Sequence, residues 1–120
     1  MKRSGALIVT GGGRGIGAAT ARLAAKRGYA VCVNYLNDRA SAEAVAQEIR
    51  DADGRAITVA GDVAVEKDVL NLFQESDRSL GPLTALVNNA GIVARRSRLD
   101  EMDQERLQRM FAVNVLGAFL

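Results

Sequence analysis

The chain alternates short apolar runs with segments in which apolar residues recur at helical spacing. The runs predict strands over residues 6–10, 30–35, 56–60 and 84–88. Helical periodicity between them predicts helices over residues 15–28, 39–53 and about 65–80, and a last helix from about residue 103 to the end. Strands that are apolar on both faces and separated by helices favour an α/β fold, a doubly wound parallel sheet in three layers (α/β/α).

The same spacing assigns a side to each helix. On the first helix it aligns Ile16, Thr20, Leu23 and Arg27. On the second and third helices it predicts core positions at Ala42, Val45, Ala46, Ile49, Val65, Val69, Leu72, Phe73 and Ser76.

The final segment is strongly apolar from Phe111 to Leu120 and stops without a polar cap. A helix with an exposed apolar end requires a partner, and the fourth strand requires a neighbour on its open side. We therefore expect residues 1–120 to form the N-terminal part of a longer single domain, or to be completed by another chain, so that the sheet is incomplete in this chain.

Composition excludes several classes of function. The chain has 48% hydrophobic residues, a net charge of +2, one cysteine and no histidine, which leaves no Ser-His-Asp triad, and we expect no metal site. No apolar run approaches the ~20 residues of a membrane span, so we expect a cytoplasmic protein without membrane partners. The basic cluster Arg95, Arg96 and Arg98 has no aromatic neighbours and predicts a solvated loop, with no nucleic-acid partner. Cys32 is expected to be a buried structural thiol.

A glycine-rich segment, Thr10 to Gly17, joins the first strand to the first helix. Glycines permit positive φ and a close backbone approach to a pyrophosphate, and the helix offers free N–H groups and the positive end of its dipole. No Lys followed by Ser or Thr comes after the glycines, which excludes a Walker phosphate loop. A ligand-free turn is the alternative.

Three more signals lie at later element ends. Asp62-Val63 follows the third strand, where the Asp is expected to be a helix cap, a ligand contact or both. The run from Asn88 to Gly91 ends the fourth strand, as a turn or as part of a ligand crevice. Asn114 lies on the apolar face of the last helix, where its amide needs hydrogen-bond partners in a structural or an active site.

The spacing Thr-Gly-x-x-x-Gly-x-Gly at Thr10, Gly11, Gly15 and Gly17 resembles the short-chain dehydrogenase/reductase family. The other three signals follow in the family's order, so the resemblance covers the whole chain. It is nearest to the branch of 3-oxoacyl-acyl-carrier-protein reductases and glucose-1-dehydrogenases, for which Val33-Asn34-Tyr35 is typical. The resemblance implies a Rossmann-type NAD(P)-binding domain over residues 1–120.

The resemblance also implies site residues. Asn114 would be catalytic, helping to hold a water near the active Lys. The cofactor would contact Gly11, Gly13, Arg14, Gly15, Ile16, Gly17, Asn34, Tyr35, Asp62, Val63, Asn89, Ala90 and Gly91. The family's catalytic Ser and Tyr-x-x-x-Lys are absent from these 120 residues, and we expect them beyond Leu120.

We expect NADP as the cofactor, with NAD possible. The strand-end position that holds an acidic residue in NAD-selective enzymes falls at Tyr35, and Arg14 is placed near the adenosine ribose. The expected activity is hydride transfer to or from a small alcohol, ketone, sugar or 3-oxoacyl substrate, in a homodimer or homotetramer. The alternatives are a nucleotide-binding or regulatory module without catalysis, and a methyltransferase that binds S-adenosylmethionine.

Overall fold

The computed structural model describes residues 5–89 of the chain. Ala90, Gly91, Asn114 and the cluster of Arg95, Arg96 and Arg98 lie outside these residues. The elements are β1 (Gly5–Val9), α1 (Gly15–Lys26), β2 (Tyr29–Tyr35), α2 (Arg39–Asp51), β3 (Ala56–Ala60), α3 (Glu66–Leu80) and β4 (Leu83–Val87). The elements predicted for this part of the chain are thus confirmed, with bounds that differ by at most two residues.

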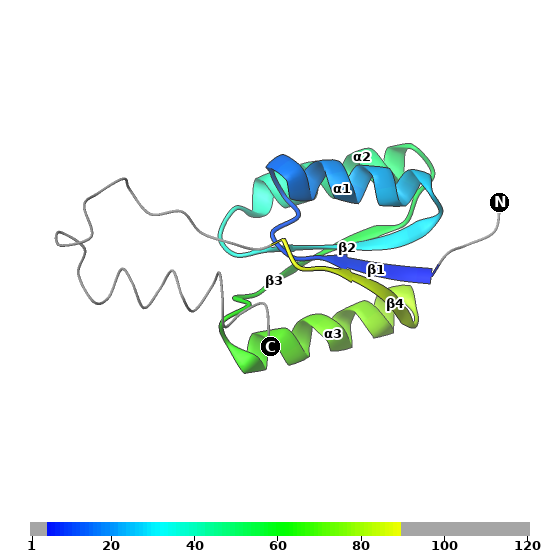
Figure 1. The fold of residues 1–120 in the computed structure, drawn as a ribbon. Coiled ribbons are helices and arrows are strands. Elements are labelled where there is room, and N and C mark those ends of the chain that lie inside the picture. The colour runs from blue at the N-terminus through cyan, green and yellow to red at the C-terminus, as the bar shows by residue number, and fades with distance from the viewer. Residues whose placement is uncertain (1–4, 90–120) are drawn as a thin grey trace, which may run out of the picture.

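The four strands form one parallel sheet in the order β3-β2-β1-β4. Helices α1 and α2 cover one face and α3 covers the other, which gives the predicted three layers (Figure 1). From β1 the chain proceeds to β2 and β3 on one side, whereas β4 pairs with β1 on its other side. This reversal beside β1 is the point at which doubly wound sheets commonly bind ligands, outside the carboxyl ends of their strands.

Alternate residues of the central strands fill two separate cores. Leu7, Val9, Val31 and Val33 pack with α1 and α2, whereas Ala6, Ile8, Ala30 and Cys32 pack on the side of α3. The strands are therefore apolar on both faces, as the sequence predicted, because helices cover both sides.

The buried face of α1 differs from the side picked out by helical spacing. Ile16 and Leu23 are 79% and 53% exposed, and the buried residues are Gly17, Ala18, Ala21 and Ala24. Small side chains let the helix axis lie close to the sheet, so the larger residues are left outside. The core positions predicted on α2 are confirmed at Ala42, Val45, Ala46 and Ile49, and those on α3 at Val69, Leu72 and Ser76. The core position predicted at Val65 is wrong, because Val65 is the N-cap of α3 and is 43% exposed.

Cys32 is fully buried in β2, which confirms the expected structural thiol. Burial, and secondarily the nearby Glu75 carboxylate, raise the pKa of the Cys32 thiol to about 12. The thiol therefore stays protonated and unreactive at neutral pH.

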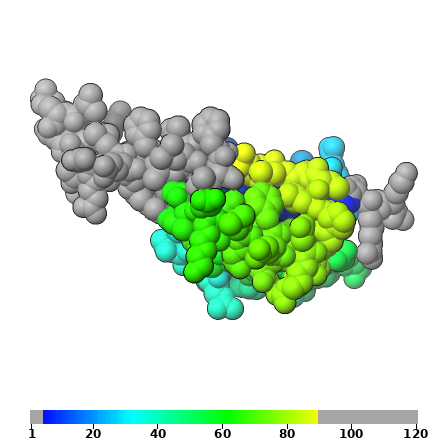
Figure 2. All heavy atoms as spheres, turned by 90° about the horizontal axis from the view of Figure 1, so that it is seen from below, coloured from blue at the N-terminus to red at the C-terminus, as the bar shows by residue number. Residues whose placement is uncertain are grey.

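Strand β4 is the least covered strand of the described sheet. Its residues alternate between partly buried and exposed, and its yellow atoms reach the surface beside α3 (Figure 2). Leu86 is 42% exposed. Within residues 5–89, no helix combines the length and the apolar character that crossing a membrane would need.

Candidate nucleotide-binding site

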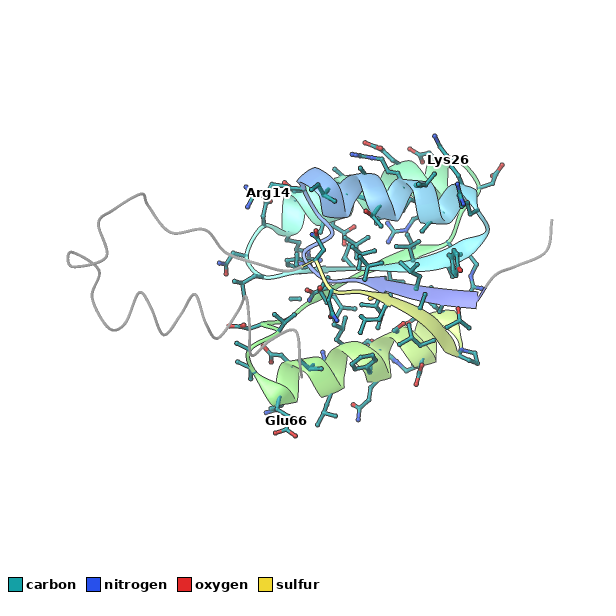
Figure 3. The ribbon with its side chains drawn as sticks, in the orientation of Figure 1. Arg14, Lys26 and Glu66 are labelled. Atoms are coloured by element: carbon teal, nitrogen blue, oxygen red, sulfur yellow. The ribbon has the colours of Figure 1, made fainter. Side chains whose placement is uncertain are left out.

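Three loops lie along the carboxyl edge of the sheet. The glycine loop (residues 10–17) follows β1, Gly61 to Val63 follow β3, and Asn88 and Asn89 follow β4. All strands are parallel, so these loops share one edge. Figure 3 shows Arg14 at this edge, at the start of α1, with Glu66 at the same end of α3 and Lys26 at the far end of α1. Among the described residues, the glycine loop, Asp62-Val63 and Asn88-Asn89, which are far apart in the sequence, thus lie at the same edge of the sheet.

The glycine loop is shaped by backbone that other residues would disfavour. Gly11 and Gly15 have φ values of 62° and 55°. A Cβ on Gly17 would lie 2.5 Å from the Asn89 side-chain nitrogen and closer still to the Gly11 carbonyl oxygen. Around Gly15, by contrast, a Cβ would have no atom within 4 Å. The loop is therefore tight underneath and open above, a shape that fits a group lying against its backbone.

Gly13 has a different role in the loop. A Cβ there would lie 3.1 Å from the backbone nitrogen of Ala42 and 3.3 Å from its Cα. Gly13 therefore lets the loop lie close to the first turn of α2, which is a packing role that does not depend on a ligand.

The N-terminus of α1 carries no cap of its own. Its N-cap residue, Arg14, makes no side-chain hydrogen bond to the helix, and the first turn holds no acidic residue. The first N–H groups of a helix have no acceptor within the helix, and the helix dipole adds positive potential at this end. This end of α1 is suited to an anionic group such as a phosphate.

Thr10 and Asn89 fasten the glycine loop to β4. The Asn89 backbone N–H donates to Thr10 Oγ1 over 3.0 Å, and Thr10 Oγ1 donates to the Val87 carbonyl over 3.2 Å. The Asn89 side-chain amide donates to the Gly11 carbonyl over 3.0 Å. This side chain therefore holds the glycine loop, a structural role in addition to the cofactor contact that the resemblance implies.

Asn34 and Tyr35 end β2, which lies between the glycine loop after β1 and the loop after β3. Asn34 is only 2% exposed, and its amide bonds both the glycine loop and the end of β3. The Tyr35 carbonyl accepts from the Gly61 N–H over 2.9 Å, and its ring is partly buried against the core under α1 and α2. Both residues lie at the expected edge, and Asn34 faces inward.

Asp62 is not the cap of α3, so that interpretation of the sequence was wrong. The N-cap of α3 is Val65, which makes no side-chain cap. Instead, Asp62 Oδ1 accepts the Ala64 N–H over 2.9 Å, closing a turn, and the Asp62 N–H donates to Asp68 Oδ2 over 2.9 Å. Val63 beside it is buried. The loop after β3 is therefore fixed by the side chain of Asp62 within it and by that of Asp68 in α3.

One acidic residue near the site was missed by sequence reasoning. Asp38, the N-cap of α2, has its Oδ2 3.8 Å from Nε of Arg14. Its carboxylate also accepts from the Ser41 hydroxyl over 2.6 Å and the Ser41 N–H over 3.0 Å. These bonds, with a smaller contribution from Arg14, hold the pKa of Asp38 below its ordinary value. The spacing Asp-x-x-Ser at a predicted helix start is the sequence signal that indicates such a cap.

The sheet order and the glycine loop at its switch point define a Rossmann-type α/β domain. The chain belongs to the short-chain dehydrogenase family, whose sequence model, "short chain dehydrogenase", matches residues 6–120.

Individual relatives agree with this assignment. An uncharacterized oxidoreductase of Escherichia coli (strain K12), YgfF, is 42% identical over 113 residues, which are 94% of this chain and 46% of that protein. A dehydrogenase/reductase from Sinorhizobium meliloti 1021 superposes with a TM-score of 0.92 at 36% identity, over 98% of this chain and 46% of that structure. A Serratia marcescens short-chain dehydrogenase/reductase mutant gives a TM-score of 0.91 at 34% identity, over 98% and 47%. The chain thus spans about half the length of the relatives it matches.

Proposed function

We propose that the protein containing this chain is an NADP(H)-preferring oxidoreductase, and that residues 1–120 form part of its cofactor-binding domain. Its reaction would be hydride transfer between the nicotinamide and a carbonyl or hydroxyl carbon of a small molecule. The observation that carries the proposal is the uncapped, glycine-lined N-terminus of α1 at the switch point of the sheet.

The residues present fit a dinucleotide. The pyrophosphate would be held by the backbone of Gly15, Ile16 and Gly17, where the loop is open above and donors are free of side-chain caps. The adenosine end would lie between Tyr35 and the Asp62-Val63 turn, and the Asn89–Gly91 segment would border the nicotinamide half. The bound cofactor supplies the hydride chemistry, while these groups bind and orient it.

The preference for NADP rests on Arg14. Its side chain is 80% exposed and lies at the mouth of the glycine loop (Figure 3). A charge-assisted bond from its guanidinium to the additional phosphate is worth about 1.5–3 kcal/mol, or roughly ten- to a hundredfold in affinity. The Asp38 carboxylate 3.8 Å away reduces this advantage, since it competes for the same cation.

The chemical step needs residues outside the described ones. Asn114 is proposed as the catalytic residue of this chain, helping to hold a water that serves proton transfer. An alcohol, ketone, sugar or 3-oxoacyl substrate, a cytoplasmic location and a homodimer or homotetramer stay predictions from the sequence. If the natural chain carries no Ser and Tyr-x-x-x-Lys, the function is nucleotide binding without catalysis.

A titration of the complete protein tests the function. NADPH, NADH and S-adenosylmethionine are compared by calorimetry, which needs no chromophore in the ligand. We expect NADPH to bind best, NADH roughly ten- to a hundredfold more weakly, and S-adenosylmethionine not to bind. Binding of S-adenosylmethionine alone would establish the methyltransferase hypothesis instead.

Arg14→Ala tests the preference. We expect it to weaken NADPH roughly tenfold or more and to leave NADH nearly unchanged, because only NADPH carries the additional phosphate. Arg22→Ala is the matched control: it removes the same charge from the same helix, at a side chain paired with Glu48 over 2.7 Å. Equal losses for both cofactors in the Arg14 variant would assign Arg14 to the shape of the loop.

A further inference from the structure

The side chain of Asn34 is buried, yet it bonds in three directions. Its Oδ1 accepts the Gly11 N–H over 3.3 Å, and its Nδ2 donates to the carbonyl oxygens of Val59 and Gly61, each over 3.2 Å. The partners fix the orientation of the amide, because a flipped amide would set nitrogen against an N–H and oxygen against two carbonyls. Both N–H donors of Nδ2 and one lone pair of Oδ1 are used in these bonds.

These bonds join two segments that lie on opposite sides of β2. Gly11 opens the glycine loop after β1, and Gly61 opens the Asp62 turn after β3, with β2 between them. The backbone of β2 holds the same two segments: the Asn34 carbonyl accepts from the Gly12 N–H over 3.0 Å, and the Tyr35 carbonyl accepts from the Gly61 N–H over 2.9 Å. Asn34 is thus a bridge across the end of β2.

We propose that Asn34 is a positioning residue that sets the separation between the glycine loop and the turn after β3. It does so without touching the nucleotide, since its polar atoms face protein groups and its side chain is buried. This inference rests on the proposed function, in which the two segments hold the pyrophosphate and the adenosine end of one dinucleotide. Such a ligand binds both segments only when their separation matches its length.

The position demands an amide for a physical reason. Replacing the amide by an apolar side chain would leave the Gly11 N–H and the two carbonyls without these bonds inside the protein. A carboxylate keeps an acceptor for the Gly11 N–H but turns an oxygen toward the Val59 and Gly61 carbonyls. Each replacement therefore removes a different part of the bridge.

The experiment compares Asn34→Val, Asn34→Asp and Cys32→Ala in the complete protein. Valine favours strands and has no polar side-chain atom. Cys32→Ala is the matched control, because it removes buried atoms from the same strand on the face of α3, away from both loops. Two quantities are measured: the dissociation constants of NADPH and NADH, and hydrogen–deuterium exchange at the Gly11 amide without cofactor.

We expect both Asn34 variants to weaken NADPH and NADH alike by about tenfold or more, and Asn34→Val to speed exchange at Gly11. Cys32→Ala should lower stability but leave both quantities near wild type. Affinity that falls in proportion to stability in all three variants, or wild-type affinity in either Asn34 variant, would overturn the inference. If wild type binds neither cofactor, the proposed function fails. In that case, unchanged hydrogen exchange at the Gly11 amide in Asn34→Val would also show that Asn34 does not hold the glycine loop.

Discussion

Helices α1 and α2 lie side by side on one face of the sheet and begin at the same edge, but their N-termini differ (Figure 1). Helix α2 is closed by its own side chain, because the Asp38 carboxylate accepts the Ser41 N–H over 3.0 Å. The N-cap of helix α1 is Arg14, whose side chain cannot accept a hydrogen bond, so α1 has no side-chain cap. One helix satisfies its end internally, and the other leaves its end for an external group.

Under the proposed function, the capped end of α2 serves the fold and the uncapped end of α1 serves ligand binding. A Ser, Thr, Asp or Asn cap typically stabilises a helix end by about 1 kcal/mol, and it needs no ligand to do so. An uncapped end gives up that stability and keeps its N–H groups available to an anion. The comparison predicts that adding a side-chain cap to α1 will raise the stability of the protein and weaken cofactor binding.

The largest effect is expected from Arg14→Asp, which gives α1 the cap that α2 has. Arg14 has an extended backbone, φ −147° and ψ 163°, which suits a capping residue. The new carboxylate should bond the first-turn N–H groups, raise the melting temperature without cofactor, and weaken NADPH and NADH by about a hundredfold. Thermal unfolding and cofactor titration measure the two effects.

Arg14→Ala supplies the control for that variant, since it removes the cation without adding a cap. It should not raise the melting temperature, and its loss should be confined to NADPH. If Arg14→Asp binds NADH as well as wild type does, the N-terminus of α1 is not the pyrophosphate site, and the contrast between the helices has no functional meaning.

A smaller but still large effect is expected from Gly17→Ala. Alanine favours helix more than glycine does, by about 1 kcal/mol, so helix propensity alone predicts a more stable protein. The added Cβ would instead collide with the Gly11 carbonyl and the Asn89 amide. We expect lower stability and roughly tenfold weaker cofactor binding, because the loop must move away from the helix.

Ala19→Val is the matched control for Gly17→Ala. It enlarges an exposed position of the same helix, so it should leave cofactor affinity near wild type. A Gly17→Ala protein that is more stable and binds normally would show that the loop tolerates the Cβ, against the close contact seen in the structure.

The sequence predicted most of this fold because the pattern of burial is repeated in every unit. Strands apolar on both faces and helices with one apolar side could be read directly, and each described element lies within two residues of its predicted bounds. The prediction was weakest on α1. There, a face of glycine and alanine is buried while Ile16 and Leu23 are exposed, because close approach to the sheet mattered more than side-chain hydrophobicity.

The site could be predicted only as a set of loops. The sequence placed Asn34 and Asn89 beside a cofactor, but it could not show that their amides bond the glycine loop across 23 and 78 residues of chain. It also passed over Asp38, whose closeness to Arg14 depends on how α1 and α2 pack together. Contacts between distant segments are set by tertiary structure and leave no local pattern.

The negative charge of Asp38 can be separated from its role as the cap of α2. An asparagine at this position would still accept a hydrogen bond, so Asp38→Asn keeps the cap of α2 and removes only the negative charge near Arg14. With less competition for the guanidinium, NADPH should bind about threefold more tightly while NADH is unchanged, an effect kept small by solvent screening. Asp38→Ala is the control for the cap: it removes the same charge but should also lower the melting temperature by a few degrees.

The smallest effect is the pH dependence of that same cap. Hydrogen bonds from the Ser41 hydroxyl and N–H, with a smaller effect of Arg14, hold the pKa of Asp38 below its ordinary value of 3.8. The folded protein therefore binds this proton less readily than the unfolded chain does. The charged cap stabilises the fold above the ordinary pKa, and this contribution is lost as the pH falls through the lowered pKa.

The melting temperatures of wild type and Asp38→Asn, measured between about pH 7 and pH 2.5, isolate this contribution, because an asparagine cap does not titrate in that range. We expect wild type to be slightly more stable than the variant at neutral pH, and the gap to be constant down to about pH 5 and then to close as the carboxylate is protonated. A gap that widens on acidification would mean that folding raises the pKa of Asp38. The negative charge of the carboxylate would then destabilise the fold, and the N-termini of α1 and α2 would differ less in stability than their hydrogen bonds indicate.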